Sequence, residues 1–169
     1  MLDDFIARCR REARAIYLGE GRIACRALGR YDLIVDADDI GITPNIVCDG
    51  FWEPGISVLL ERLLKPGMTA VDIGANVGYF SLLMASRVGA NGRVVSIEAN
   101  PAMAGLLRET VEMNGLEECV TVHNVAAADR AGELDFYIIP DRNLNGCILL
   151  DEWRERVDPA RLSRVRAAA

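Results

Sequence analysis

The 169-residue chain is 51% hydrophobic and 26% charged, which is enough to bury the core of one soluble domain. Its net charge of −6 argues against nucleic acid or an anionic membrane as a partner, and no stretch approaches the roughly 18 apolar residues of a membrane-spanning helix. With one histidine and five cysteines that form no C-x-x-C pair, the sequence predicts no metal site and no disulfide framework, but reduced, mostly buried thiols in a cytoplasmic protein.

Residues 1–66 are expected to form an N-terminal region packed on the core that follows. Apolar side chains recur at three- and four-residue intervals from Leu2 to Tyr17, which predicts an amphipathic helix ended by Gly19 or Gly21. The next expected elements are strands 22–28 and 31–37, which form a hairpin around Gly29 and Arg30, and a helix over 55–64 that stops before Pro66.

Residues 67–139 change to an alternation of strands and helices. The expected order is a strand over 68–73, a helix over 77–88, a strand over 93–98, a helix that begins at Asn100 and Pro101 and ends at Asn114, and a strand over 119–126. Because alternating strands and helices form parallel sheets with right-handed crossovers, the sequence predicts an α/β, Rossmann-like half with strands buried on both faces.

The end of the chain shows a different pattern. Residues 132–139 alternate and follow a turn-like run, which predicts a hairpin strand rather than another crossover. Residues 140–169 are expected to form a helical tail in which Asp158 and Pro159 start a new helix. The three regions are expected to make up one domain.

The stretch VDIGANVGYF, residues 71–80, occupies the first strand-to-helix turn, where open α/β sheets bind ligands. Gly74 and Gly78 suit a tight turn, and the new helix offers free N–H groups. In a dinucleotide fingerprint a second glycine would stand at Asn76, and Tyr79 occupies its final small position. These two side chains favour a nucleoside ligand without a pyrophosphate.

Two acidic residues narrow the type of ligand further. Asp72 lies two residues before the turn, where its carboxylate can attract the amino group of an amino acid. Glu98 ends the second strand, where a carboxylate can accept hydrogen bonds from both hydroxyls of a ribose. S-adenosylmethionine combines an adenosine with an amino acid and carries no phosphate, so it matches this pattern better than NAD does.

The segments VDIGANVGYFSLL, VVSIEANP, VAAAD and GELDFYI closely resemble the FkbM-like family of S-adenosylmethionine-dependent methyltransferases. The resemblance implies a class I methyltransferase core and methyl transfer to an oxygen of a sugar, polyketide or other small metabolite. It also implies the cofactor contacts: a methionine-side loop of Asp72, Gly74, Asn76 and Gly78, a ribose site at Glu98 beside Asn100, and an adenine site at Asn124 and Val125. Glu53, in the W-E-P turn, either lines the donor pocket or makes a structural turn contact.

The chain departs from the FkbM-like pattern after the hairpin. The family continues with a strand carrying an acid-rich D-x-E/Q-G-x-E segment, which this sequence does not contain. We therefore expect an N-terminal part of a methyltransferase, with an unpaired sheet edge that the tail helix or self-association covers. The acceptor is expected to be a small molecule. The sequence identifies neither that molecule nor whether this chain is active.

Two other functions stay open at this point. One is a catalytically inactive module for S-adenosylmethionine binding or for assembly. The other is an NAD(P)-binding oxidoreductase, which Asn76 and Tyr79 disfavour. The sequence identifies no catalytic base, because the single histidine, His123, is expected to be held by packing in the third strand.

Overall fold

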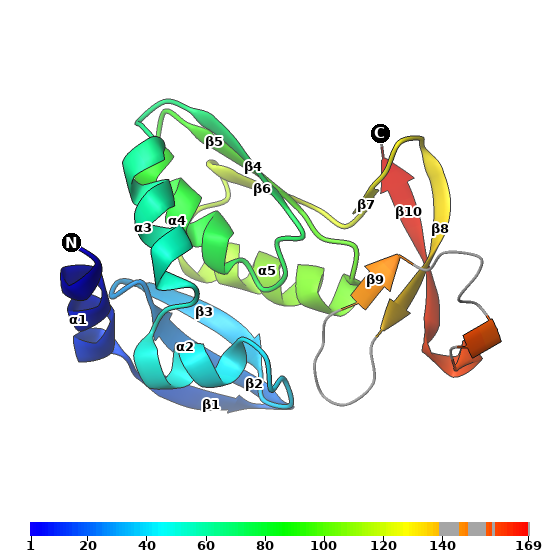
Figure 1. Ribbon diagram of the computed structural model, residues 1–169, viewed down its shortest axis with the longest axis horizontal. Coiled ribbons are helices and arrows are strands. Elements are labelled where there is room, and N and C mark those ends of the chain that lie inside the picture. Colours follow the sequence, from blue (N-terminus) through cyan, green and yellow to red (C-terminus); the bar gives the residue numbers. More distant parts are fainter. Residues whose placement is uncertain (139–145, 149–154, 157, 169) are drawn as a thin grey trace.

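The computed structural model describes residues 1–138, 146–148, 155–156 and 158–168 (Figure 1). Its elements in chain order are α1 (Leu2–Glu12), β1 (Ala15–Gly19), β2 (Arg22–Ala27), β3 (Tyr31–Asp36), α2 (Thr43–Asp49), α3 (Pro54–Leu63), β4 (Thr69–Ile73), α4 (Tyr79–Val88), β5 (Arg93–Ile97), α5 (Pro101–Met113), β6 (Val120–His123), β7 (Ala126–Ala127), β8 (Gly132–Ile138), β9 (Gly146–Ile148) and β10 (Leu162–Ala168). They form three small sheets, one parallel and two with antiparallel pairs.

The parallel sheet has the order β4-β5-β6 and confirms the predicted α/β alternation. Val71 lies beside Val95, and Val95 beside Thr121, so the three strands run in register. Helices α4 and α5 cover one face of this sheet, where Ala70 and Val94 are buried among their side chains. The carboxyl ends of the strands therefore meet at one edge of the sheet, beside the start of α4.

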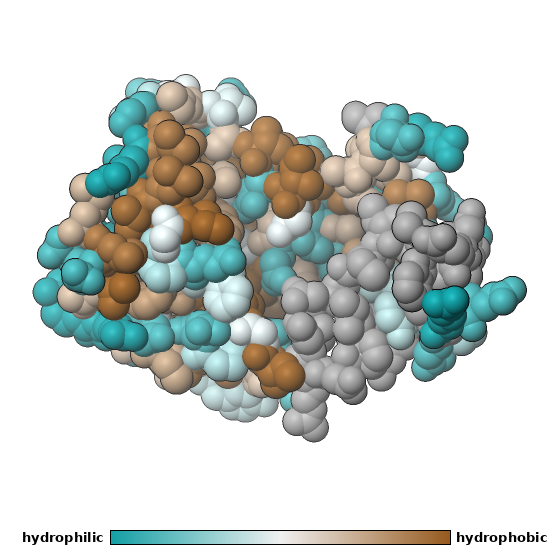
Figure 2. Space-filling model, viewed as in Figure 1, coloured by the Kyte–Doolittle hydropathy of each residue, from teal (hydrophilic) through white to brown (hydrophobic). Residues whose placement is uncertain are grey.

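The other face of β4 is exposed, which corrects the prediction of a strand buried on both faces. Val71 is 52% exposed and Ile73 is 66% exposed, while Ala70 and Asp72 on the opposite face are buried. Figure 2 shows apolar surface over α3 and along β4. Within the described residues β4 is also an edge strand, so both its outer edge and this face lack a covering layer.

The N-terminal region contains the predicted β2-β3 hairpin, but the first helix is shorter than expected. It ends at Glu12, and Ala15–Gly19 pairs with β2 as an antiparallel strand, with Tyr17 opposite Ile23. The pairing with β2 overrides the helical spacing, and Gly19 and Gly21 form the hairpin turn instead of a helix cap. Between β3 and the predicted helix over 55–64, residues Thr43–Asp49 form α2, a helix that the sequence did not predict.

Helix α5 joins the N-terminal sheet to the parallel sheet. The backbone N–H of Ile34 in β3 donates to Thr110 Oγ1 at 3.0 Å, and that of Asp32 donates to the Asn114 side chain at 3.0 Å. Leu107 and Val111 of the same helix pack with Val94 of β5 and Val120 of β6. The helix thus holds the two sheets together.

The tail is not helical where the structure describes it between residues 158 and 168. After a short 3₁₀ turn over Pro159–Arg161, β10 pairs antiparallel with β8, with Val165 opposite Leu134, and parallel with β7. The predicted strand at β8 is confirmed as an antiparallel strand, although its partner β10 was expected to be a helix. Within the expected helical tail, residues Gly146–Ile148 form the strand β9 instead, which pairs with β8. Residues 140–145, 149–154, 157 and 169 of that tail lie outside the described residues.

The described cysteine side chains differ in burial. Cys9 and Cys25 are buried, Cys119 is half-buried and Cys48 is exposed, so the expectation of buried thiols holds for part of the set. Burial raises the pKa of the Cys9 and Cys25 thiols to about 11. Among the helices described, none combines the length and the apolar character that crossing a membrane requires.

Candidate functional site

The turn between β4 and α4 is held over the end of β5. Backbone N–H groups of Gly74 and Ala75 both donate to the Ile97 carbonyl, at 2.9 and 3.0 Å. The turn needs a left-handed backbone at three positions, with φ of 78° at Gly74, 51° at Asn76 and 97° at Gly78. Glycine supplies two of these and asparagine, which tolerates this region well, supplies the third.

Glu98 ties the turn to the start of α5. Its Oε2 accepts the backbone N–H of Asn76 at 2.8 Å, and its Oε1 accepts the backbone N–H of Asn100 at 2.7 Å. The side chain is 8% exposed, so these charge-assisted hydrogen bonds lie in a largely dry environment. The carboxylate is therefore fixed at the carboxyl end of β5.

The residues present fit an adenosine-type ligand at this position. A Cβ built on Gly74 meets no atom within 4 Å, so the turn leaves open space above its backbone. Each Glu98 oxygen has one donor among the hydrogen bonds described, and a carboxylate oxygen accepts two. Both oxygens can accept a ribose hydroxyl as well.

Gly78 has a different role from Gly74. A Cβ built on Gly78 would overlap Leu107 Cδ1 of α5, so this glycine permits the close packing of α4 and α5. Of the two glycines in this turn, Gly74 has open space beside it and Gly78 does not.

Asp72 is buried beneath the turn and belongs to a hydrogen-bonded chain of side chains. Ser81 Oγ donates to Asp72 Oδ2 at 2.6 Å and lies 2.7 Å from Ser96 Oγ. Burial raises the pKa of Asp72, an effect opposed by the Ser81 hydrogen bond and reinforced by the nearby charge of Glu98. Neither serine was predicted as part of the site, although each interrupts an apolar run at a position that the strand or helix period turns inward.

Asn100 caps the start of α5, and Asn124 binds the backbone that follows β5. The predicted N-cap is confirmed, because Asn100 Oδ1 accepts the Ala102 N–H at 3.0 Å. Asn124 Nδ2 donates to the carbonyls of Glu98 and Ala99 at 2.8 and 3.0 Å, and with Pro101 it lines a cavity of about 290 Å³ that also touches β10. Val125 is half-buried next to it.

Tyr79 does not face the ligand side of the turn. It is 2% exposed, and its hydroxyl lies 3.0 Å from Ser57 Oγ in α3, while burial raises its pKa to about 12. The sequence argument that Tyr79 obstructs a pyrophosphate is therefore wrong, because the first turn of α4 directs this ring into the core. Asn76 keeps its side chain close to the turn, where Oδ1 accepts the Val77 N–H at 2.7 Å.

The W-E-P turn is held near the start of α4 by the contact between Ser57 and Tyr79. Ser57 Oγ donates to the Trp52 carbonyl at 2.9 Å while it meets Tyr79. Glu53 caps α3 in a left-handed conformation, with φ of 41°, and its side chain is exposed. No described contact joins Glu53 to the glycine turn, so its place in the donor pocket stays a prediction.

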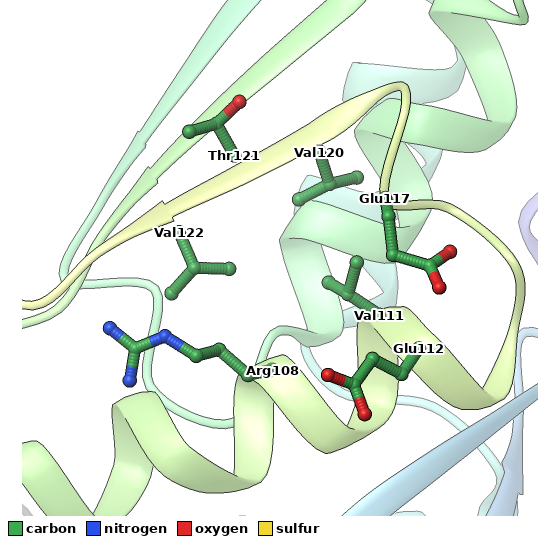
Figure 3. Close-up of a pocket in the computed structure, with 7 residues that line it drawn as sticks. All are labelled: Arg108, Val111, Glu112, Glu117, Val120, Thr121 and Val122. Atoms are coloured by element: carbon green, nitrogen blue, oxygen red, sulfur yellow. The ribbon is translucent and has the colours of Figure 1, made fainter.

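Two further features lie away from the glycine turn. A pocket of about 250 Å³ between α5 and the outer edge of β6 contains none of the predicted site residues (Figure 3). His123, at the end of β6, is exposed, so the expectation that packing holds its side chain is wrong. Its carbonyl accepts the Glu98 N–H at 3.0 Å.

A parallel sheet with a glycine turn after its first strand and a carboxylate at the end of the second defines a Rossmann-like protein of the class I methyltransferase type. The chain belongs to the TRM5/TYW2 methyltransferase domain family, which matches residues 57–143. S-adenosylmethionine is the methyl donor of this family, and the open space at Gly74 and the carboxylate of Glu98 fit it.

Individual relatives cover the same region. The chain is 34% identical over 84 residues to protein-L-isoaspartate O-methyltransferase of Triticum aestivum, covering 50% of this chain and 33% of that protein. It is 30% identical over 103 residues to catechol O-methyltransferase of Bos taurus, covering 60% of this chain and 37% of that protein. The chain thus spans about a third of the length of these relatives.

A solved structure shares the fold. The crystal structure of P. horikoshii TYW2 in complex with MeSAdo superposes with a TM-score of 0.53 at 25% identity, over 69% of this chain and 40% of that one. The comparisons give no support to the expectation that nucleic acid is no partner.

Proposed function

We propose that this chain is the donor-binding part of a methyltransferase that transfers a methyl group to an oxygen of a small metabolite. The observation that carries the proposal is the position of Glu98, whose carboxylate joins the turn at Asn76 to the start of α5 and keeps lone pairs for a ligand. An enzyme that positions a nucleoside needs such a fixed acceptor next to an open backbone.

Each part of the donor is bound by a different group of the predicted residues. Glu98 accepts the ribose hydroxyls, and Asn124 and Val125 enclose the adenine at the end of β6. The amino acid part lies along Gly74 and above Asp72, with Glu53 at the exposed side. The cavity beside Asn124 and the open space at Gly74 support this division.

The chemistry requires positioning more than proton transfer. S-adenosylmethionine supplies, when bound, an electrophilic methyl group that an acceptor oxygen attacks in line with the departing sulfur. The residues of this chain hold the donor in one orientation and exclude water from its ribose side, which lowers the entropic barrier. No residue is assigned as the base that takes the hydroxyl proton.

A small acceptor with an oxygen nucleophile is supported by two observations. The segments 71–83 and 94–101 resemble the FkbM-like enzymes, and catechol O-methyltransferase of Bos taurus is 30% identical over 60% of this chain. The buried, reduced thiols are consistent with a cytoplasmic location. A second acceptor class, tRNA, is favoured by the family match.

Self-association through β4 completes the proposal. The strand has an unpaired edge within the described residues, and Val71 and Ile73 are exposed beside it without a charged neighbour on their own strand face. Natural proteins rarely leave such an edge open, so pairing with a second copy gives both chains a covered edge.

Methyl transfer from donor labelled in its methyl group tests the proposal. The chain is mixed with the labelled donor and, separately, with catechol, a simple sugar and bulk tRNA, and label is counted in each acceptor. Labelling of a small hydroxyl compound above the level of a Glu98→Ala variant supports the proposal. Labelling of tRNA alone contradicts the small acceptor, and donor binding without any labelling favours the inactive binding or assembly module.

A further inference from the structure

A further cavity lies at the end of α4 opposite the glycine turn. It has a volume of about 270 Å³ and is enclosed by α1, the β2-β3 turn, α3 and the last turn of α4. Its polar side chains come from Arg8, Arg30, Glu61, Ser86 and Arg87. Since Arg87 lies eight residues beyond Tyr79 in α4, the rise of the helix places the cavity end of α4 about 12 Å from the end at the glycine turn.

The cavity is basic in a protein whose net charge is −6. Three guanidinium groups line it against one carboxylate, and that carboxylate, Glu61, pairs with Arg8 at 2.9 Å. Arg30 and Arg87 have no carboxylate partner among the ion pairs of the described residues. Their two charges therefore remain for a ligand.

The two remaining arginines are positioned in different ways. The Arg30 guanidinium stacks on the Tyr31 ring, with its carbon 4.5 Å from the ring centre, which limits its orientations. Arg87 Nε is buried, and no described group accepts its hydrogen. A buried donor without an acceptor is destabilising, so an anion that accepts this hydrogen would stabilise the chain. Turning Arg87 toward such an anion breaks no hydrogen bond at Nε.

The β2-β3 turn brings Arg30 against α1. Gly29 has a φ of 70°, and a Cβ at this position would lie 3.3 Å from Arg8 Cγ. Glycine thus permits a close approach of the turn to the helix, and this approach places Arg30 and Arg8 on the same cavity.

One electrostatic effect opposes an anion here. The carboxyl end of α4 carries a partial negative charge, equivalent to roughly half an elementary charge. Two guanidinium groups without carboxylate partners outweigh it, and both can donate paired N–H groups to the oxygens of one anion.

We propose that this cavity binds a phosphoryl group, either as inorganic phosphate or as the phosphate of a small monoester. The bidentate geometry of Arg30 and Arg87 matches tetrahedral oxyanions, and the volume lies just below the roughly 300 Å³ at which pockets for drug-sized ligands begin. The site is separate from the donor turn, and its test does not depend on methyl transfer.

Thermal unfolding of the full chain tests the site. Sodium phosphate, glycerol 3-phosphate and sodium chloride are compared at equal ionic strength, because a ligand that binds the folded chain raises its Tm by mass action. We expect phosphate to raise the Tm above the chloride value. A matching rise with glycerol 3-phosphate identifies a monoester as a ligand, whereas a rise with phosphate alone identifies the free ion.

Three variants with the same change in charge identify the site. Arg87→Gln and Arg30→Gln are expected to weaken phosphate binding by about tenfold each, as loss of a charged hydrogen bond predicts. Arg14→Gln, an exposed residue outside the cavity, should change it by less than about twofold. Arg30 is exposed, so its variant keeps the test valid if Arg87→Gln does not fold. A Tm rise equal to that in chloride, or equal rises in all three variants, would overturn the proposal.

Discussion

Glu98 Oε2 accepts the backbone N–H of Asn76 at 2.8 Å, across 22 positions of the sequence. The contact joins the strand end that is expected to hold the ribose to the turn that is expected to hold the methionine. Because the carboxylate also accepts the N–H of Asn100, one side chain fixes both ligand-facing segments. Changes to the turn are therefore expected to act on ligand binding, and changes beneath it on stability.

The two glycines of the turn are predicted to differ when each is replaced by alanine. Gly74→Ala puts a methyl group into open space on the ligand side, so donor affinity should fall by about tenfold, or ~1.4 kcal/mol. It also places alanine at a φ of 78°, which should cost ~1–2 kcal/mol of stability. Gly78→Ala overlaps Leu107 and should cost ~1–3 kcal/mol of stability. Calorimetric titration with S-adenosylhomocysteine and urea unfolding measure the two effects. Equal affinities for Gly74→Ala and wild type would place the ligand elsewhere.

Asp72→Asn is predicted to stabilise the chain at neutral pH. Burial raises the pKa of Asp72 above its ordinary 3.8, so the folded chain holds this proton more tightly than the unfolded chain does. The resulting stability is complete below pH 3.8 and is lost as the pH rises through the folded pKa. Asparagine does not ionise, so the variant does not lose this stability as the pH rises. Its amide oxygen can still accept the hydrogen bond from Ser81 Oγ.

Urea unfolding over a range of pH checks the Asp72 prediction. The exposed Asp38→Asn serves as the control for a change in charge. Lower stability of Asp72→Asn at pH 7 would mean that the fold favours the ionised carboxylate, contrary to its burial. The same variant should bind S-adenosylhomocysteine less tightly if Asp72 attracts the amino group of the donor.

Tyr79→Phe is predicted to cost ~0.5–1.5 kcal/mol in unfolding free energy, because it removes a buried hydroxyl that meets Ser57. Burial raises the pKa of Tyr79 from 10.0 to about 12, so the stability that it adds below pH 10 is lost as the pH approaches 12. Absorbance titration of the phenolate should lose its highest transition in the variant. Tyr17→Phe, at an exposed tyrosine, should retain that transition.

Ile73→Lys is predicted to weaken self-association. Ile73 is 66% exposed on the unpaired β4 strand, and a lysine there opposes pairing between sheet edges. Sedimentation equilibrium measures the mass in solution, with Met113→Lys on α5 as the control for a lysine at another exposed apolar site. A wild-type chain that sediments as a monomer at high concentration contradicts the proposed pairing.

The central strands and the turn could be predicted from the sequence because their signals are local. Alternation of short apolar runs with helical segments indicates β4 to β6, and Asn100 beside Pro101 indicates the start of α5. Strands β1 and β10 were wrongly predicted as helix. Their conformation is decided by pairing, of β1 with β2 across a short turn and of β10 with the distant β8. Local spacing carries no information about such partners.

The site was predictable by residue type but not by orientation. Asp72 and Glu98 were placed correctly at the ends of their strands, yet Asp72 proves to be buried on Ser81 and Glu98 to be bound by two backbone N–H groups. Tyr79 was assigned to the ligand side, although the direction of α4 turns it toward α3. Helix direction follows from packing between elements, which one sequence does not encode locally.

Calorimetric titration of the wild-type chain and of Glu98→Ala with S-adenosylhomocysteine and with NAD tests the central claim most directly. We expect the wild type to bind S-adenosylhomocysteine and not NAD, and Glu98→Ala to lose about 1.5–3 kcal/mol of that affinity with the hydrogen bonds to the ribose. Glu117→Gln, which also removes one negative charge, should bind as the wild type does. Tighter binding of NAD, or unchanged affinity in Glu98→Ala, would contradict the account.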